Sequence, residues 1–162
     1  MKEFNTVEDI ILENITVVDA AIENHLSNDI SSDAIVYWGY NIGIIKGINI
    51  EDEQILIKIL IDITVQNKEH QKLDITGQFT INAIFQVKSL IEYINKIDDD
   101  SIHEMDASLA SILLSTAYST ARGIIYTRCL GTILGNVILP IVSVKQLLDI
   151  SDNKLLKENT EI

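Results

Sequence analysis

The sequence predicts a single soluble α+β domain, with a four-stranded antiparallel sheet followed by a long buried helix and a shorter C-terminal helix. Apolar and polar residues alternate with a period of two between about residues 8 and 87. The turns between these runs are short, as expected for antiparallel neighbours. From about residue 106 to residue 158 the apolar spacing becomes helical. The length of 162 residues suits one domain, residues 1–162.

Four segments of the first half are expected to be strands. The third has the clearest pattern, because β-branched residues alternate strictly with other residues along it. In the first, the apolar side chains change parity at Glu13 and Asn14, which predicts a bulge there. The polar stretch 19–33 is expected to be a connection. The predicted strands cover residues 8–18, 35–50, 54–66 and 72–87.

The second half is expected to contain the helices. A short helix is predicted for residues 88–98 and a long one for residues 106–130, with Gly131 as its C-terminal stop. Ser143 is expected to begin the last helix, because Gln146 completes a capping box with it.

The long predicted helix is apolar nearly all round. After Asp106 its only charged residues are Arg122 and Arg128, and such a helix is buried on more than one side. We therefore expect at least a dimer, in which Arg122 pairs with a carboxylate across a subunit interface or with carbonyls at a helix end. A membrane span is disfavoured, because a charge in mid-helix is costly in lipid. The expected interface residues are Leu113, Ala117, Ala121, Arg122 and Ile125.

Charge and cysteine content narrow the range of partners. The net charge is −12, so binding to nucleic acid or to an anionic membrane surface is disfavoured, whereas basic unfolded polypeptides would be attracted. The single cysteine, Cys129, cannot form an internal disulfide. The N-terminal segment lacks the basic start and apolar run of a signal peptide, and we expect a cytoplasmic protein.

No residue pattern predicts an enzyme or a cofactor. The sequence has no phosphate-binding loop, no Rossmann fingerprint and no nucleophile elbow. Cys129 lies among apolar neighbours and is interpreted as a buried structural thiol. One cluster of acidic residues could attract a metal cation. The preferred interpretation is that these residues form a solvated start of a helix, where the helix dipole favours negative charge. Its residues are Asp99, Asp100, His103, Glu104 and Asp106.

Short motifs between Gly77 and Leu148 resemble the SecB family of export chaperones. Gly77-Gln78-Phe79 matches a Gly-x-Phe element on the last strand of that family. The segment Tyr118-Ser119-Thr120-Ala121-Arg122 is similar to the family's Pro-Tyr-Ala-Arg segment, and the chain from there to Leu148 can be laid on the family pattern without a gap. Val142 then falls on the valine of an Ala-Pro-Val element, and Leu147 falls on a family leucine.

The resemblance implies a fold, an assembly and an activity. The implied fold is a four-stranded antiparallel sheet with a long and a shorter helix. The implied assembly is a homotetramer, a dimer of dimers with the long helices between the sheets. The implied activity is ATP-independent holding of unfolded polypeptides in apolar grooves, followed by delivery to the export motor SecA. Candidate client contacts, which would otherwise be core residues, are Trp38, Tyr40, Ile42, Phe79 and Leu147.

The sequence also departs from the family. The acidic sheet positions that dock SecA fall on Asn14, Val18 and Lys72, none of which is acidic, and this weighs against motor docking. The long helix and the segment around Pro140 are closer to a divergent SecB-like branch that includes chaperones of toxin–antitoxin systems. Three hypotheses stay open. The first is a holdase for exported proteins. The second is a chaperone dedicated to one partner such as an antitoxin, or another non-catalytic interaction module. The third is an enzyme or small-ligand protein.

Overall fold

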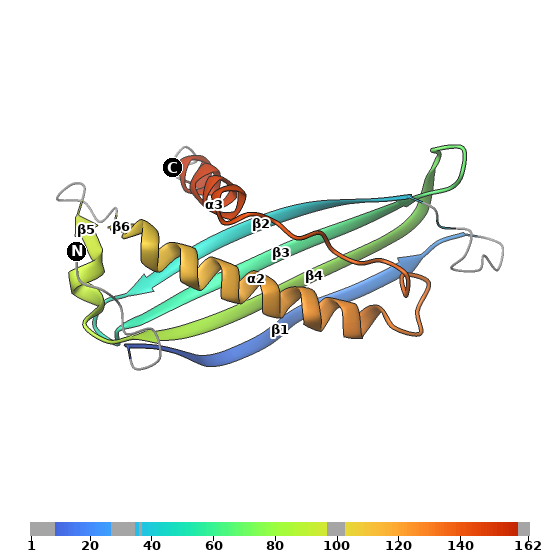
Figure 1. Ribbon diagram of the computed structural model, residues 1–162. Helices are drawn as coiled ribbons and strands as arrows, with labels where there is room; N and C mark the ends of the chain where they lie inside the picture. Colours follow the sequence, from blue (N-terminus) through green and yellow to red (C-terminus); the bar gives the residue numbers. More distant parts are fainter. Residues whose placement is uncertain (1–8, 27–34, 36, 97–102, 159–162) are drawn as a thin grey trace.

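The computed structural model describes residues 9–26, 35, 37–96 and 103–158 (Figure 1). Its element order confirms the predicted fold class, with four long strands first and two helices after them. The elements are β1 (Ile10–Asn24), β2 (Tyr37–Asn49), β3 (Gln54–Gln66), β4 (Lys72–Val87), the 3₁₀ turn η2 (Leu90–Tyr93), β5 (Ile94–Lys96), β6 (His103–Met105), α2 (Ala107–Cys129) and α3 (Val144–Glu158).

The four long strands form one sheet in the order β1-β4-β3-β2, with every neighbouring pair antiparallel. The register aligns Ile44 of β2 with Ile59 of β3, and Ile59 with Ile81 of β4. Each of these side chains is at most 1% exposed. Every second residue of β3 from Ile55 to Val65 is buried on the same face, as the alternation predicted. The core therefore lies on this face of the sheet.

The edge strand β1 is longer than the sequence predicts. It continues to Asn24, whereas a connection was expected from residue 19, and this part of the prediction was wrong. The register shifts between Leu12 and Asn14, which confirms the predicted bulge, and shifts again between Val17 and Asp19. Two bulges reverse the parity of the side chains twice, so β1 as a whole shows no continuous alternation.

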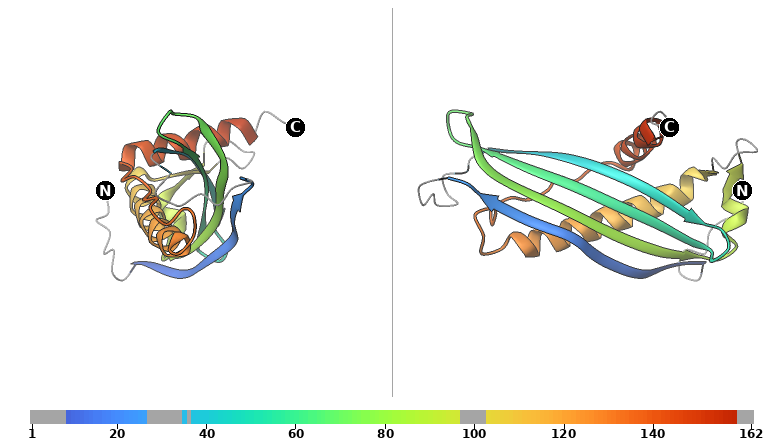
Figure 2. Two further views of the ribbon diagram at one scale, coloured as in Figure 1. Left: turned by 90° about the vertical axis from the view of Figure 1, so that its right-hand side faces the viewer. Right: turned by 180° about the vertical axis from the view of Figure 1, so that it is seen from behind.

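Both helices cover the apolar face of the sheet. α2 contacts β3 and β4 and runs diagonally across them, whereas α3 lies against β2 (Figure 1). An end-on view shows the sheet curving around α2, with α3 on the same side (Figure 2). α3 is attached to β2 by an ion pair between Lys46 Nζ and Asp152 Oδ1 at 2.9 Å. In the described part of the chain, neither helix combines the length and apolar character needed to cross a bilayer.

The predicted helix ends are confirmed. Gly131 follows α2 with a φ of 77°, a left-handed conformation that glycine adopts without steric cost. Before α3, the N–H of Gln146 donates to Ser143 Oγ at 3.3 Å, and the N–H of Ser143 donates to Gln146 Oε1 at 3.0 Å. These two reciprocal bonds form the capping box.

The connection between the sheet and α2 differs from the prediction. In place of the helix predicted for 88–98, the chain makes one 3₁₀ turn and then the strand β5, which pairs with β6; residues 97 and 98 lie outside the described residues. Ser89 has a φ of 56° just before this turn, and its N–H donates to Glu53 Oε1 at 2.8 Å. This contact directs the chain away from a regular helix at the point where one was expected.

Candidate functional site

Two aromatic side chains of β2 remain exposed on the core face of the sheet. Trp38 pairs with Val65 and Tyr40 with Ile63, so both aromatic rings share the face of the buried β3 residues. Val65 and Ile63 are fully buried, whereas Trp38 and Tyr40 are 36% and 47% exposed. An exposed aromatic pair on a core face needs a local explanation, because such residues normally pack inward.

The chain that follows α2 explains why β2 is left uncovered here. Leu134 packs over Gly77 on β4, and a Cβ at Gly77 would come within 2.7 Å of the Leu134 side chain. Gly77 pairs with Ile63, which pairs with Tyr40. The loop after α2 therefore covers β4 in the row that contains Tyr40. α3 reaches β2 at the other end of the strand, around Lys46, and Tyr40 lies between these two covers.

An extended segment, residues 137–142, crosses the sheet between the two helices (Figures 1 and 2). Val137 and Leu139 are buried, whereas Ile138 and Ile141 are 59% and 86% exposed. The segment thus contributes apolar side chains both to the core and to the surface. We call the exposed residues Trp38 and Tyr40, the half-buried Ile42 and this segment the β2 surface.

Two side chains of α2 hold the segment through its carbonyl groups. Arg122 Nε donates to Leu139 O at 3.2 Å, and the Tyr118 hydroxyl donates to Pro140 O at 3.0 Å. The pKa of Tyr118 is raised to about 12, mainly by burial and also by Tyr40, against the lowering effect of Arg122. The Tyr118 hydroxyl therefore remains protonated and can donate at neutral pH.

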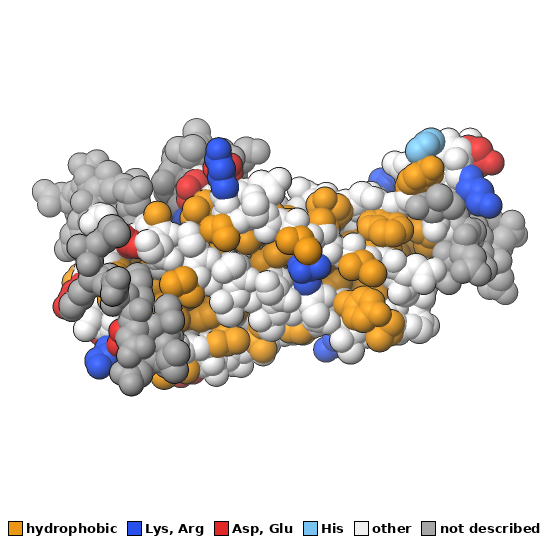
Figure 3. All heavy atoms as spheres, viewed as in Figure 1, with side chains coloured by type: hydrophobic (Ala, Val, Ile, Leu, Met, Phe, Trp, Pro, Cys, Tyr) orange, Lys and Arg blue, Asp and Glu red, His pale blue; other side chains and the backbone are white. Residues whose placement is uncertain are grey.

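The middle of the helix-bearing face shows hydrophobic side chains scattered among uncharged atoms, with a basic side chain between them and no acidic one (Figure 3). In this view the acidic side chains lie towards the two ends of the molecule. A surface with this distribution favours apolar contacts at its centre, and its ends attract basic groups.

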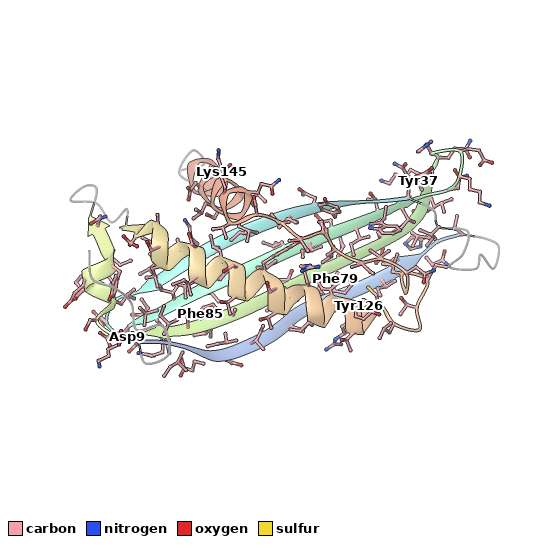
Figure 4. The ribbon with its side chains drawn as sticks, viewed as in Figure 1. Asp9, Tyr37, Phe79, Phe85, Tyr126 and Lys145 are labelled. Atoms are coloured by element: carbon pink, nitrogen blue, oxygen red, sulfur yellow. The ribbon has the colours of Figure 1, made fainter. Side chains whose placement is uncertain are left out.

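The five predicted client contacts divide into two groups. Trp38, Tyr40 and Ile42 lie on the β2 surface, and their role in binding stays a prediction. Phe79 and Leu147 are only 3% and 1% exposed, and Figure 4 shows Phe79 beneath α2. These two residues belong to the core of the protomer, so they could meet a client only if the helices moved.

Four of the predicted interface residues are buried within the protomer itself. They lie on the side of α2 that faces the sheet, and each is at most 2% exposed. These residues are Leu113, Ala117, Ala121 and Ile125. Arg122 is half-buried, and its partner is the carbonyl of Leu139 in the extended segment rather than a carbonyl at a helix end. A contact between copies stays a prediction, and a second copy would meet the opposite side of α2.

The opposite side of α2 is lined by small and polar residues. They surround a shallow depression of about 490 Å³, formed by Ser119, Thr120, Gly123, Ile124, Thr127 and Arg128. A Cβ added at Gly123 would meet nothing within 4 Å. This side of the helix therefore has room for another element to approach closely.

A pocket of about 570 Å³ brings together polar residues of all four long strands. It contains the carboxylates of Asp19 and Asp62, and its other residues are Asn41, Ile42, Gly43, Leu60, Gln78, Phe79, Thr80 and Ile150. The lining includes no histidine, cysteine, serine or lysine. Within the described ranges, no three histidine, cysteine, aspartate or glutamate side chains are grouped to hold a metal. The pocket thus offers no paired nucleophile and base of the usual kind.

The other candidate reactive residues that the structure describes are buried or take part in secondary structure. Cys129 is buried, and burial raises the pKa of its thiol, so the reactive thiolate is disfavoured at neutral pH. Asp106 caps α2 by accepting backbone N–H bonds at 2.8 and 3.2 Å, as the helix-start interpretation predicted. His103 and Glu104 lie in β6, and Asp99 and Asp100 lie outside the described residues.

Comparison with known proteins identifies the fold. No family model matches the sequence, and no curated protein matches it. The structure is similar to the Rv1957 SecB-like chaperone of Mycobacterium tuberculosis, solved in complex with a ChAD peptide from the Rv1956 HigA1 antitoxin. The TM-score is 0.57 at 15% sequence identity, over 85% of this chain and 93% of that chain. A Streptococcus agalactiae protein of unknown function aligns with a TM-score of 0.43 at 9% identity, over 82% and 98% of the two chains.

The chain therefore has the fold of a SecB-like chaperone, as the motifs between Gly77 and Leu148 predicted. The sequence did not predict the hydrogen bond of Tyr118 or the exposure of Ile138 and Ile141. The spacing of Tyr118 and Arg122 was a usable signal, because residues four apart on a helix point to the same side. Nothing in the sequence indicated that both would bind consecutive carbonyls of one segment.

Proposed function

We propose that this protein is an ATP-independent chaperone that holds unfolded or partly folded polypeptides on the β2 surface. The observation that carries the proposal is the exposed pair Trp38 and Tyr40, whose cross-strand neighbours are buried. The fold supports it, because a SecB-like chaperone with this fold was solved with a bound peptide.

Burial of apolar surface would supply the binding energy. Each Å² of apolar surface that a client covers contributes about 25 cal/mol, so no nucleotide or catalytic group is required. The net charge of −12 would speed the approach of basic, unfolded chains, and this contribution should weaken as salt is added. We infer a non-catalytic role in the cytoplasm.

An aggregation assay tests the proposal directly. A chemically denatured, slowly refolding protein is diluted into buffer with an equimolar amount of this protein, and light scattering is followed with and without ATP. We expect the same suppression in both conditions, because binding alone protects the client. Without any suppression the chaperone proposal fails, and suppression that requires ATP would indicate another class of protein.

The choice between an export role and a dedicated partner rests on two observations. The positions that correspond to motor-docking acids are Asn14, Val18 and Lys72, which favours a partner other than SecA. The mycobacterial protein of the same fold was solved with an antitoxin peptide. We propose the dedicated chaperone as the second candidate function. Identification of proteins that co-purify from the native cell would separate an antitoxin from many exported proteins, and a neighbouring toxin–antitoxin gene pair would favour the antitoxin.

We also propose a homotetramer, or at least a dimer, in which α2 contacts another copy through the depression around Gly123. Multi-angle light scattering should give a mass well above the 18.1 kDa of one chain. Gly123→Gln should reduce that mass, because its side chain fills the depression, while the helical content stays unchanged since nothing in the protomer opposes a Cβ there. A wild-type monomer at micromolar concentration would contradict the proposal.

A further inference from the structure

The extended segment 137–142 is held to the protomer by unusually few hydrogen bonds. Before it, the N–H of Val137 donates to Leu134 O at 2.9 Å, and after it the N–H of Leu147 donates to Ser143 O at 3.0 Å. Between these points, residues 138–142 make no backbone–backbone hydrogen bond to the described chain. Pro140 has no N–H to offer. Side chains must therefore supply the polar attachment of this segment.

Tyr118 and Arg122 supply that attachment. They lie one helical turn apart on α2 and bind two consecutive carbonyls, Pro140 O at 3.0 Å and Leu139 O at 3.2 Å. Both donors come from the rigid helix and both acceptors from the extended chain. Their geometry fixes the position of the segment along α2, because two adjacent anchor points prevent both sliding and rotation.

The held segment forms one side of the β2 surface. The segment runs across the sheet from the end of α2 to α3, which lies against β2 (Figure 1). Ile138 and Ile141 of the segment are 59% and 86% exposed. A polypeptide lying on Trp38 and Tyr40 would meet this segment as its lateral boundary.

We propose that Tyr118 and Arg122 are positioning residues that act as one clamp and preorganise segment 137–142 for client binding. This inference rests on the proposed function. A segment that is already fixed loses less conformational freedom when a client binds, and preorganisation of this kind raises affinity without adding a contact to the client. Release of the clamp should therefore weaken binding even though neither residue needs to touch the client.

Three variants separate this role from a general structural one. Tyr118→Phe keeps the buried ring and removes only the hydroxyl, Arg122→Met keeps the apolar stem, and Arg122→Lys restores a donor. Tyr126→Phe is the matched control, because Tyr126 is 45% exposed on the same helix and its hydroxyl has no hydrogen-bond partner among the described residues. All variants are compared with the wild-type protein at a temperature well below every melting temperature. Differences in thermal stability then do not affect the comparison.

Two measurements are made on each variant. Fluorescence anisotropy gives the Kd for a short labelled peptide rich in Leu and Phe and flanked by lysines. Thermolysin, which cuts before large apolar residues, gives the rate of native-state cleavage within segment 137–142, identified by mass spectrometry. That rate reports local opening of the segment.

We expect Tyr118→Phe and Arg122→Met each to raise the Kd about three- to tenfold, as for the loss of one hydrogen bond, and to accelerate cleavage of the segment. Arg122→Lys should recover part of both effects, and Tyr126→Phe should change neither. The double variant should lose less than the product of the single effects, because the two bonds hold one element. Faster cleavage with unchanged Kd, or unchanged cleavage with raised Kd, would overturn the clamp. If the wild type fails to bind the peptide, the proposed function fails and the binding role of the clamp with it, while the cleavage rates still show whether the two residues hold the segment.

Discussion

The double variant Trp38→Ser/Tyr40→Ser should lose client holding almost completely while remaining folded. Aromatic residues at the centre of a binding surface each contribute about 2 kcal/mol when they are hot spots, so a loss of both should raise the Kd by at least about 100-fold. The fold should tolerate the change, because the two side chains are 36% and 47% exposed. Titration with the labelled peptide and thermal unfolding measure the two effects separately.

Tyr37→Ser provides the matched control for this experiment. Tyr37 neighbours Trp38 in β2 and is 44% exposed, but it lies on the opposite face of the sheet, where its ring stacks on His70 at 4.3 Å between centroids. Its loss should leave the Kd unchanged. If Tyr37→Ser weakens binding as much as the double variant, the client does not bind the β2 surface. If the double variant unfolds, the two aromatic residues belong to the hydrophobic core instead of a binding surface.

Leu113→Ala should lower the free energy of unfolding by about 2–5 kcal/mol, the usual range for a fully buried leucine. Leu113 is 0% exposed in the protomer and belongs to the core cluster with the isoleucines of β3. Denaturant unfolding followed by circular dichroism measures the loss. Because the lost contacts lie within one chain, the destabilisation should be the same at low and high protein concentration.

The concentration dependence decides between core and interface for this residue. A residue whose main contacts cross an interface stabilises the protein more as concentration rises, since assembly is linked to folding by mass action. Ser108→Ala serves as control, because Ser108 is exposed near the start of α2, outside the depression around Gly123, and its loss should cost less than about 0.5 kcal/mol. If the destabilisation by Leu113→Ala grows with protein concentration, Leu113 lies at the interface between copies, as the sequence predicted.

The sequence predicted the sheet well where one face is buried and poorly where burial does not constrain the pattern. β3 lies in the middle of the sheet, so its alternation from Ile55 to Val65 is complete, and its predicted bounds, residues 54–66, are those of the structure. β1 lies at an edge of the sheet, and its backbone pairs with β4 as far as Asn24. This pairing uses backbone groups and does not require apolar side chains. Polar residues such as Asp19 and Glu23 are tolerated there because they face solvent, and they were mistaken for a connection.

The candidate site was predictable in its residue types but not in its exposure. Trp38, Tyr40, Phe79 and Leu147 are all apolar residues on core-facing positions, and nothing in their local sequence separates them. One cover that the local pattern does not show is Leu134, which packs over Gly77 on β4, whereas Trp38 and Tyr40 on β2 stay partly exposed. This cover comes from a loop more than fifty residues away in the chain, so only the tertiary structure shows which aromatic rings stay bare.

Trp38 is the one tryptophan in the sequence, and this gives the protein an intrinsic optical reporter at the β2 surface. An indole that is partly open to water emits at a longer wavelength and is quenched more readily than one in a dry environment. All tryptophan emission of the protein comes from this single position, so the covering of the β2 surface can be observed without attaching any dye. Because no second tryptophan contributes background, even a transient complex could be timed by the change in its emission.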